Sequence, residues 1–277
     1  MPELPEVETI TNGLRPLLEH SQINHVFFFR DDLRWVIPKE TILKALVHNK
    51  ILRVFRRSKY IIFETSVGYV YVHLGMSGKI HCYSDEKPKH PHTHWVLKFT
   101  DSVQKTMFLH YIDPRRFGMI TARCEPSWEE HPLLSSLGVE PLETRNLGAY
   151  LWKKSRSTRQ SIKSYIMNSK IVVGVGNIYA CESLFLAMIN PQTQACKLSK
   201  SNYQSLALSI KKILRKAIKA GGTTLQDFRS VSETPGYFAV FLNVYGRQGD
   251  SCCRCGSEIW QIKQTGRSTW FCSQCQC

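Results

Sequence analysis

The chain ends in a cluster of cysteines that constrains its fold. Six of its ten cysteines lie in the last 26 residues, and four of them form two C-x2-C pairs, Cys252 with Cys255 and Cys272 with Cys275. Two such pairs, 16 residues apart, have the spacing of a tetrahedral zinc site with four thiolate ligands. The segment is too short to build a core of its own, so a bound metal would supply its folding energy. We therefore expect one structural Zn²⁺ in a small C-terminal hairpin.

The alternatives for this tail are two disulfides or free thiols, and Cys253 could compete as a ligand. Histidine ligands are excluded, because no histidine follows His131. Between the two cysteine pairs, the sequence Gly266-Arg267-Ser268 predicts a turn that points an arginine outward. Basic turns of this kind often contact a groove or a phosphate of nucleic acid.

The charge of the chain is strongly uneven. Its 277 residues carry a formal net charge of +15, and a chain of this length suggests two domains, or three if one is small. Between residues 150 and 220, thirteen basic side chains accompany a single acidic one, Glu182. Self-repulsion at this density favours an anionic partner. Nucleic acid is the preferred interpretation, and an acidic membrane or protein is the alternative.

Hydrophobic spacing predicts the order of the elements. Residues 5–18 predict an amphipathic helix. Residues 23–125 contain six short β-like runs with no helix-length segment among them, namely HVFFF, ILRVF, YIIFE, YVYVHLG, HWVLKF and MFLHYI. This pattern favours a β-sandwich. Three helical stretches are expected to follow, at 147–169, 177–189 and 200–219.

Asn177 is expected to cap the second of these helices. We thus predict an α+β chain with an N-terminal helix and β-sandwich domain (1–125), a linker (126–146), a helical domain (147–243) and a zinc hairpin (244–277).

The first residues suggest a chemistry of their own. Met1 is normally removed when the next residue is small, which would leave Pro2 as a secondary amine at the chain start. A terminal amine has a pKa of about 8, so on the order of a tenth of it is neutral and nucleophilic at pH 7. Its attack on an aldehyde-level carbon gives an iminium, and Glu3 and Glu6 are close enough for general acid–base work. The alternative is a disordered terminus whose acidic residues only start a helix.

The same segment disfavours a targeting signal. Residues 1–8 contain three glutamates and no basic residue, unlike a signal or transit peptide. The most apolar window, 171–189, includes Asn177 and Glu182, which makes a bilayer span an unfavourable interpretation. We expect a cytoplasmic protein without a membrane partner.

Several specific motifs occur in order along the whole chain. They are PELPEVET at the start, SKYIIFE around Lys59, HLGMSGKI (73–80), DPRRFG (113–118), VVGVGNIYACESLF (172–185), GGTT (221–224), PGYF (235–238), VYGRQG (244–249) and the four-cysteine tail. In this combination the chain resembles the formamidopyrimidine-DNA glycosylases. The resemblance implies a bifunctional DNA glycosylase and AP lyase of the helix–two-turns–helix group. Such enzymes excise oxidised purines, chiefly 8-oxoguanine and formamidopyrimidines, and nick the strand by β,δ-elimination.

The resemblance also implies the catalytic residues. Pro2 would be the nucleophile on the sugar C1′, Glu3 the proton donor, and Glu6 a hydrogen-bonding support of that site. Lys59 would hold a phosphate beside the flipped nucleotide, and Arg267 would contact a phosphate as well.

Other matched positions would contact DNA. Met76, Arg115 and Phe117 match a trio that fills the space left by the everted base, with Arg115 bonded to the orphaned partner. From their surroundings alone, Met76 would be a core residue next to a turn and Phe117 a strand residue. Contacts with the DNA backbone are implied for His73, His92, Lys163, Asn177 and Tyr245.

The chain departs from the family pattern in places. Ser164 stands where the family often has proline, and Asn168 stands where an aspartate is usual. A histidine-rich stretch leaves open whether His90 or His92 is the phosphate contact. The lesion-covering loop, about 223–238, matches only loosely.

Two alternatives remain for the function. The related endonuclease VIII class shares Pro2-Glu3 and the zinc hairpin but prefers oxidised pyrimidines. A non-catalytic DNA-binding protein on the same scaffold would result if Met1 were retained. The resemblance otherwise implies a bacterial, nucleoid-associated monomer whose partner is double-stranded DNA with oxidised or abasic lesions.

Overall fold

The computed structural model describes residues 2–222 and 241–277, and these divide into two compact units. The first unit comprises residues 2–135 with Gly221 and Gly222, and the second comprises residues 136–220 and 241–277. The loop expected at 223–238 lies outside the described residues. No helix in the part of the chain that the structure describes is both long and apolar enough to span a bilayer.

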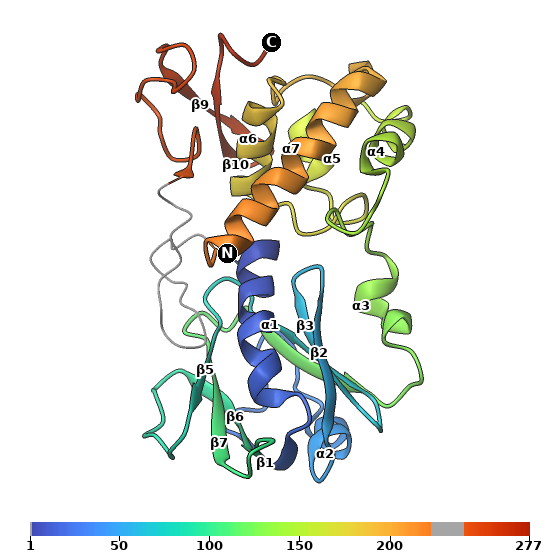
Figure 1. The fold of residues 1–277 in the computed structure, drawn as a ribbon, viewed down its shortest axis with the longest axis vertical. Coiled ribbons are helices and arrows are strands. Elements are labelled where there is room, and N and C mark those ends of the chain that lie inside the picture. Colours follow the sequence, from blue (N-terminus) through green and yellow to red (C-terminus); the bar gives the residue numbers. More distant parts are fainter. Residues whose placement is uncertain (1, 223–240) are drawn as a thin grey trace. The chain divides into compact units, whose positions relative to one another are not determined.

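The first unit contains two antiparallel four-stranded sheets (Figure 1). One has the order β1-β6-β7-β5 and consists of β1 (Gln22–Phe28), β5 (Lys79–Tyr83), β6 (Thr93–Thr100) and β7 (Thr106–Ile112). The other has the order β2-β3-β4-β8 and consists of β2 (Ile51–Arg57), β3 (Tyr60–Thr65), β4 (Tyr69–His73) and β8 (Met119–Arg123). Buried residues of both sheets form one hydrophobic core, which confirms the predicted sandwich.

Helix α1 (Leu4–Leu18) confirms the predicted N-terminal helix. Pro5 lies in its first turn, where its missing N–H has no helical partner to lose. Val7, Ile10 and Leu14 form one face, and each is at most 1% exposed. Burying such a side chain contributes about 1.5–3 kcal/mol, so this face anchors the helix in the sandwich core. The residues that start the chain are thereby held against a rigid element.

Three elements of the first unit were not expected. Helix α2 (Lys39–Leu46) shows that the expectation of no helix within 23–125 was wrong. Its buried residues Ile42, Ala45 and Leu46 follow helical spacing, but eight residues give too short a pattern to stand out among strands. Strands β5 and β8, each of five residues, also lack a distinct alternating pattern.

The region expected to be a linker, 126–146, is not wholly irregular. It contains the 3-10 helix η1 (Trp128–Glu130) and the short helix α3 (Pro132–Ser135).

The second unit is helical and ends in a hairpin (Figure 1). Its elements are α4 (Leu147–Ser155), α5 (Ile162–Ile166), α6 (Asn177–Leu186), η2 (Ala195–Lys197), α7 (Lys200–Lys219), β9 (Ile259–Gln264) and β10 (Arg267–Cys272). The predicted long helix and the C-terminal cysteine hairpin are confirmed by α7 and by β9 with β10.

Two expectations for this unit were wrong. A single helix over 147–169 is instead the pair α4 and α5, because Ser161 caps a new helix start and accepts a hydrogen bond from the Ser164 N–H. Asn177 does not cap α6: Gly176 occupies the cap position, and Asn177 is the first helical residue.

Gly118 permits a close approach that tests this packing. A Cβ at this position would overlap the Tyr111 hydroxyl and press on the His73 carbonyl. We expect Gly118→Ala to lower the free energy of unfolding by about 2–3 kcal/mol, measured by urea denaturation, because the overlap forces a backbone shift. Gly256→Ala is the control: no atom lies within 4 Å of its Cβ, and only its positive φ of +76° opposes alanine. An equal or smaller loss at Gly118 would contradict the packing described.

Candidate functional site

The start of α1 gathers the predicted catalytic residues Pro2, Glu3 and Glu6. The Glu3 N–H donates to Glu6 Oε2 at 2.9 Å as part of a capping box. The two glutamates are 4% and 3% exposed, and Pro2 is buried as well. Gly222, at φ +83°, approaches Glu6 so closely that a Cβ would lie 3.3 Å from Oε1. The start of the helix therefore shields from bulk water the carboxyl groups of Glu3 and Glu6, which follow Pro2 closely in the sequence.

Lys59 lies in the tight turn between β2 and β3. Ser58 adopts the left-handed conformation (φ +57°), and its carbonyl accepts a hydrogen bond from Arg56 Nη1 at 2.9 Å. Arg56 Nε also donates to Glu8 Oε2 of α1 at 2.6 Å. This pair ties the lysine-bearing turn to the helix that follows Pro2.

His73 ends β4 opposite Tyr60, the residue after Lys59. Its Nδ1 accepts the Gly75 N–H at 2.9 Å. Burial, assisted by the positive charges of Lys59 and Arg34, lowers the pKa of His73 to about 4. The imidazole is therefore neutral at pH 7, and its proton is on Nε2 because Nδ1 accepts. A neutral histidine of this kind can donate to a phosphate oxygen.

A buried carboxylate joins the two loops that carry the trio predicted to fill the space of an everted base, the wedge residues Met76, Arg115 and Phe117. Asp113 is fully buried, and its Oδ1 accepts from Ser77 Oγ at 2.6 Å. Its Oδ2 accepts from the Gly118 N–H at 2.8 Å and from the Tyr111 hydroxyl at 3.4 Å. Ser77 Oγ in turn accepts the Arg115 N–H at 3.2 Å. The loop after β4 and the loop after β7 are thereby fixed to each other.

These two loops border a hollow of about 690 Å³ in the first unit. Met76, Arg115 and Phe117 all line it, and the Arg115 guanidinium lies 5.0 Å from the centroid of the Phe117 ring. Met76 is 37% exposed, so the alternative that it belongs to the core is wrong. Phe117 is 46% exposed and lies in the loop between β7 and β8, so the alternative that it is a strand residue is wrong as well. Exposed apolar side chains such as these two can enter a base stack, and the guanidinium beside them can donate hydrogen bonds to a base edge.

Arg34 is a residue of this hollow that the sequence analysis missed. Its N–H donates to the Gly118 carbonyl at 3.2 Å, and its side chain lines the hollow together with His73. The available signal was the neighbouring Trp35, an aromatic next to a cation, which is 49% exposed.

His92 is exposed, and its ring lies beside that of His90, with centroids 5.5 Å apart. The His92 carbonyl accepts the Asp113 N–H at 3.0 Å, so the histidine-rich stretch adjoins the wedge loop. Which of the two rings contacts a phosphate stays a prediction.

In the second unit, two predicted DNA contacts hold the hairpin. Lys163 Nζ donates to the Ser268 carbonyl at 3.0 Å and to Thr269 Oγ1 at 2.6 Å. Asn177 Nδ2 donates to the same Ser268 carbonyl at 3.0 Å. Lys163 is only 2% exposed, so this geometry favours a structural role for it over a direct contact with DNA. Asn177 Oδ1 is buried without a hydrogen-bond partner among the described residues.

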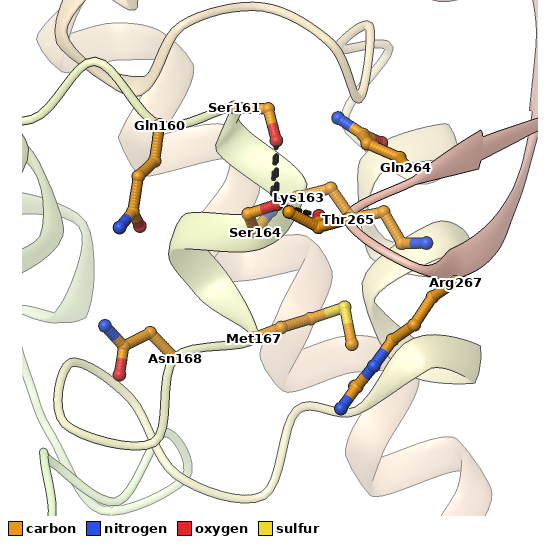
Figure 2. Close-up of a pocket in the computed structure, with 9 residues that line it drawn as sticks. All are labelled: Gln160, Ser161, Lys163, Ser164, Met167, Asn168, Gln264, Thr265 and Arg267. Carbon is orange, nitrogen blue, oxygen red and sulfur yellow. Dashed lines mark hydrogen bonds between the residues drawn. The ribbon is translucent and has the colours of Figure 1, made fainter.

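Arg267 and Tyr245 are carried by the same hairpin region. Arg267 is exposed and lines a hollow of about 550 Å³ beside α5 (Figure 2). The Tyr245 N–H donates at 3.0 Å to Glu182 Oε1, and its ring centroid lies 4.4 Å from that of Trp270. Glu182 is fully buried and also accepts the Val244 N–H at 2.9 Å. A carboxylate of α6 thus fixes the chain that enters the hairpin.

The four predicted metal ligands come together. The sulfur atoms of Cys252, Cys255, Cys272 and Cys275 all lie within 4.8 Å of one another, and all four are free thiols. Four convergent thiols suit a tetrahedral soft cation, so the cluster could hold a metal ion. The Cys253 thiol instead donates to Asn243 Oδ1 at 3.5 Å, so Cys253 is not part of this cluster.

Comparisons with known families match most of the chain. The N-terminal domain of formamidopyrimidine-DNA glycosylase matches residues 1–120, and the H2TH domain of formamidopyrimidine-DNA glycosylase matches residues 137–229. A formamidopyrimidine-DNA glycosylase of Ruthia magnifica subsp. Calyptogena magnifica is 48% identical over 276 residues, which cover 100% of both chains.

Solved structures of Lactococcus lactis Fpg are similar as well. A point mutant of that protein in complex with DNA containing Fapy-dG has a TM-score of 0.89 and 34% identity, with 99% of each chain covered. A complex with DNA containing an abasic site has a TM-score of 0.89 and 33% identity over the same share of each chain.

The low pKa of His73 predicts a pH dependence of stability. Between pH of about 6.5 and about 4, the unfolded chain binds a proton at His73 that the folded chain does not, so stability falls as the pH falls. From pH 7 to pH 5 this loss is about 2 kcal/mol. Between pH 7 and pH 5, we expect the free energy of unfolding of His73→Gln to fall by about 2 kcal/mol less than that of the unmodified chain, as measured by urea denaturation. His25→Gln, at an exposed position, is the matched control, and equal losses in the unmodified chain and His73→Gln would contradict the assignment.

Proposed function

The chain belongs to the formamidopyrimidine-DNA glycosylase family, and we propose that it is a base-excision-repair glycosylase that removes oxidised purines from duplex DNA and cleaves the abasic product. The hollow lined by Met76, Arg115 and Phe117 carries this proposal, because an enzyme that extrudes a base must fill the space it leaves. Arg115 has only donors, and cytosine offers two acceptors on its pairing edge. An orphaned cytosine, the partner of a damaged guanine, therefore suits this side chain.

The proposed chemistry starts from the Pro2 nitrogen, freed by removal of Met1. The nitrogen forms a bond to the sugar C1′, and the glycosidic bond breaks as the base leaves with a proton. Glu3, held at the helix start by its bond with Glu6, is the proton donor. The Pro2 nitrogen then loses its proton, and the C1′–O4′ bond breaks as O4′ gains one. This opens the sugar ring and gives an iminium, which acidifies C2′. Loss of a C2′ proton then expels the 3′ phosphate, and a second elimination expels the 5′ phosphate.

The remaining predicted residues would bind the DNA backbone. Lys59 and the neutral His73 would serve from the first unit, and Arg267 and Tyr245 from the second. The thirteen basic side chains of residues 150–220 add a field that attracts phosphates. Affinity should therefore fall steeply with salt. Lys163 and Asn177 would act through the hairpin that they hold.

We further propose that the ion of the four-cysteine cluster is Zn²⁺, in a purely structural role. This ion would make the hairpin 244–277 a folding unit distinct from the helical domain 147–243, with 126–146 as the linker to the catalytic domain 1–125. A cytoplasmic site of action on the bacterial chromosome fits these assignments.

One experiment tests the activity and the nucleophile together. The purified chain should nick duplexes with 8-oxoguanine faster than duplexes with thymine glycol, and borohydride should trap a covalent adduct that maps to residue 2. Pro2→Gly should lose most of the lyase activity and keep DNA binding, because the backbone contacts lie elsewhere. Preference for thymine glycol would favour the endonuclease VIII alternative. Binding without incision would favour the non-catalytic alternative. An adduct at Lys59 would refute the assignment of Pro2 as the nucleophile.

Metal removal tests the hairpin. Cys272→Ser should lose the zinc, one ion per chain by elemental analysis, and unfold the hairpin that carries Arg267. DNA affinity should then fall about tenfold or more, while the chemical step on bound substrate changes less. Cys253→Ser, outside the cluster, is the matched control. Normal affinity of a zinc-free Cys272→Ser variant would count against this role.

A further inference from the structure

The turn of the C-terminal hairpin contains a strained residue. Thr265 and Gly266 connect β9 to β10, and both adopt the left-handed conformation, with φ of +47° and +76°. Glycine adopts it readily, whereas a β-branched residue is an outlier there. Such a residue persists only where surrounding contacts over-determine its conformation.

The Thr265 hydroxyl makes a contact of this kind (Figure 2). Its Oγ1 lies 2.8 Å from Ser164 Oγ of α5, at hydrogen-bond distance. Ser161 Oγ donates to Ser164 Oγ at 3.0 Å and also accepts the Ser164 N–H at 3.3 Å. The cap of α5 is thus linked through a chain of hydroxyls to the hairpin turn, and bonds in such a chain strengthen one another.

Other bonds hold the strands on either side of this turn. Lys163 Nζ bonds to Ser268 and Thr269 of β10, and Gln264 Nε2 of β9 donates to the Pro191 carbonyl at 3.1 Å. The strands therefore have their own supports, and the bond between Ser164 and Thr265 fixes the turn between them. This division separates the stability of the hairpin from the direction of its tip.

Arg267 directly follows the turn and lines the hollow with Met167 and Asn168 (Figure 2). Building on the proposed function, we propose that Ser164 and Thr265 are positioning residues for the contact of Arg267 with a DNA phosphate. Their hydrogen bond sets the direction in which Arg267 leaves the hairpin, and so holds its guanidinium ready for a DNA phosphate. The strain at Thr265 is retained because its hydroxyl bonds to Ser164.

Thr265→Gly separates positioning from stability. The change removes the hydroxyl and relieves the backbone strain, so the zinc-loaded protein should unfold at the same or a higher temperature. Its affinity for a duplex with an abasic-site analogue should nevertheless fall about three- to tenfold, as expected for one lost hydrogen bond. Thr265→Ser keeps the hydroxyl and should retain the affinity. A merely structural role predicts that stability and affinity fall together.

A double-mutant cycle tests whether the effect passes through Arg267. In an Arg267→Ala background, Thr265→Gly should leave the Kd unchanged. In the otherwise unmodified chain, Ser164→Ala combined with Thr265→Gly should weaken binding no more than either change alone. Unaltered binding by Thr265→Gly, or equal weakening without Arg267, would overturn the proposal.

The incision assay with 8-oxoguanine reports on the proposed function separately, since failure of the unmodified chain to nick that duplex refutes the function alone. Hydrogen exchange of the amides of residues 265–268 then still tests the bond without DNA. Faster exchange in Ser164→Ala supports the bond, and unchanged exchange refutes it.

Discussion

The hydrogen bonds to the buried carboxylate of Asp113 are the interactions on which the candidate site most depends. A fully buried charge is unfavourable unless hydrogen bonds satisfy it, and Ser77, Tyr111 and Gly118 all donate to this one. Because two of these donors come from different loops, satisfying the charge also fixes the loops to each other. The exposed wedge side chains are then presented by backbone that has little freedom, and less conformational entropy is lost when DNA binds.

The second unit uses a similar arrangement around other buried charges. Glu182 is fully buried and accepts backbone N–H groups of Val244 and Tyr245, and Lys163 is nearly buried and donates to β10. Both bind the cysteine hairpin to the helices, so the four-cysteine cluster need not orient it alone. In each unit, a buried charged side chain fixes a backbone segment, and the exposed neighbours of that segment can contact a phosphate or a base.

The sequence allowed the sandwich, the first helix and the four-cysteine cluster to be predicted, because each has a strong local pattern. Helix α2 and strands β5 and β8 were missed, since five to eight residues carry too little periodicity to be recognised. Lys163 and Asn177 matched DNA-contacting positions, yet their partner is the Ser268 carbonyl about 90–105 residues away. Arg34 was missed because its place in the hollow is set by a backbone bond to Gly118. A pattern of neighbouring residues does not show which distant backbone group such a contact reaches.

We propose that the Asp113 carboxylate holds Met76, Arg115 and Phe117 in position for base extrusion. The most direct test of this role is the rate of base eversion, followed by the fluorescence of 2-aminopurine next to an 8-oxoguanine lesion. Folded Asp113→Asn, whose amide cannot accept bonds from both loops, should evert the base at least about tenfold more slowly, with duplex affinity within about threefold of the unmodified chain. Eversion at the unmodified rate would contradict the account.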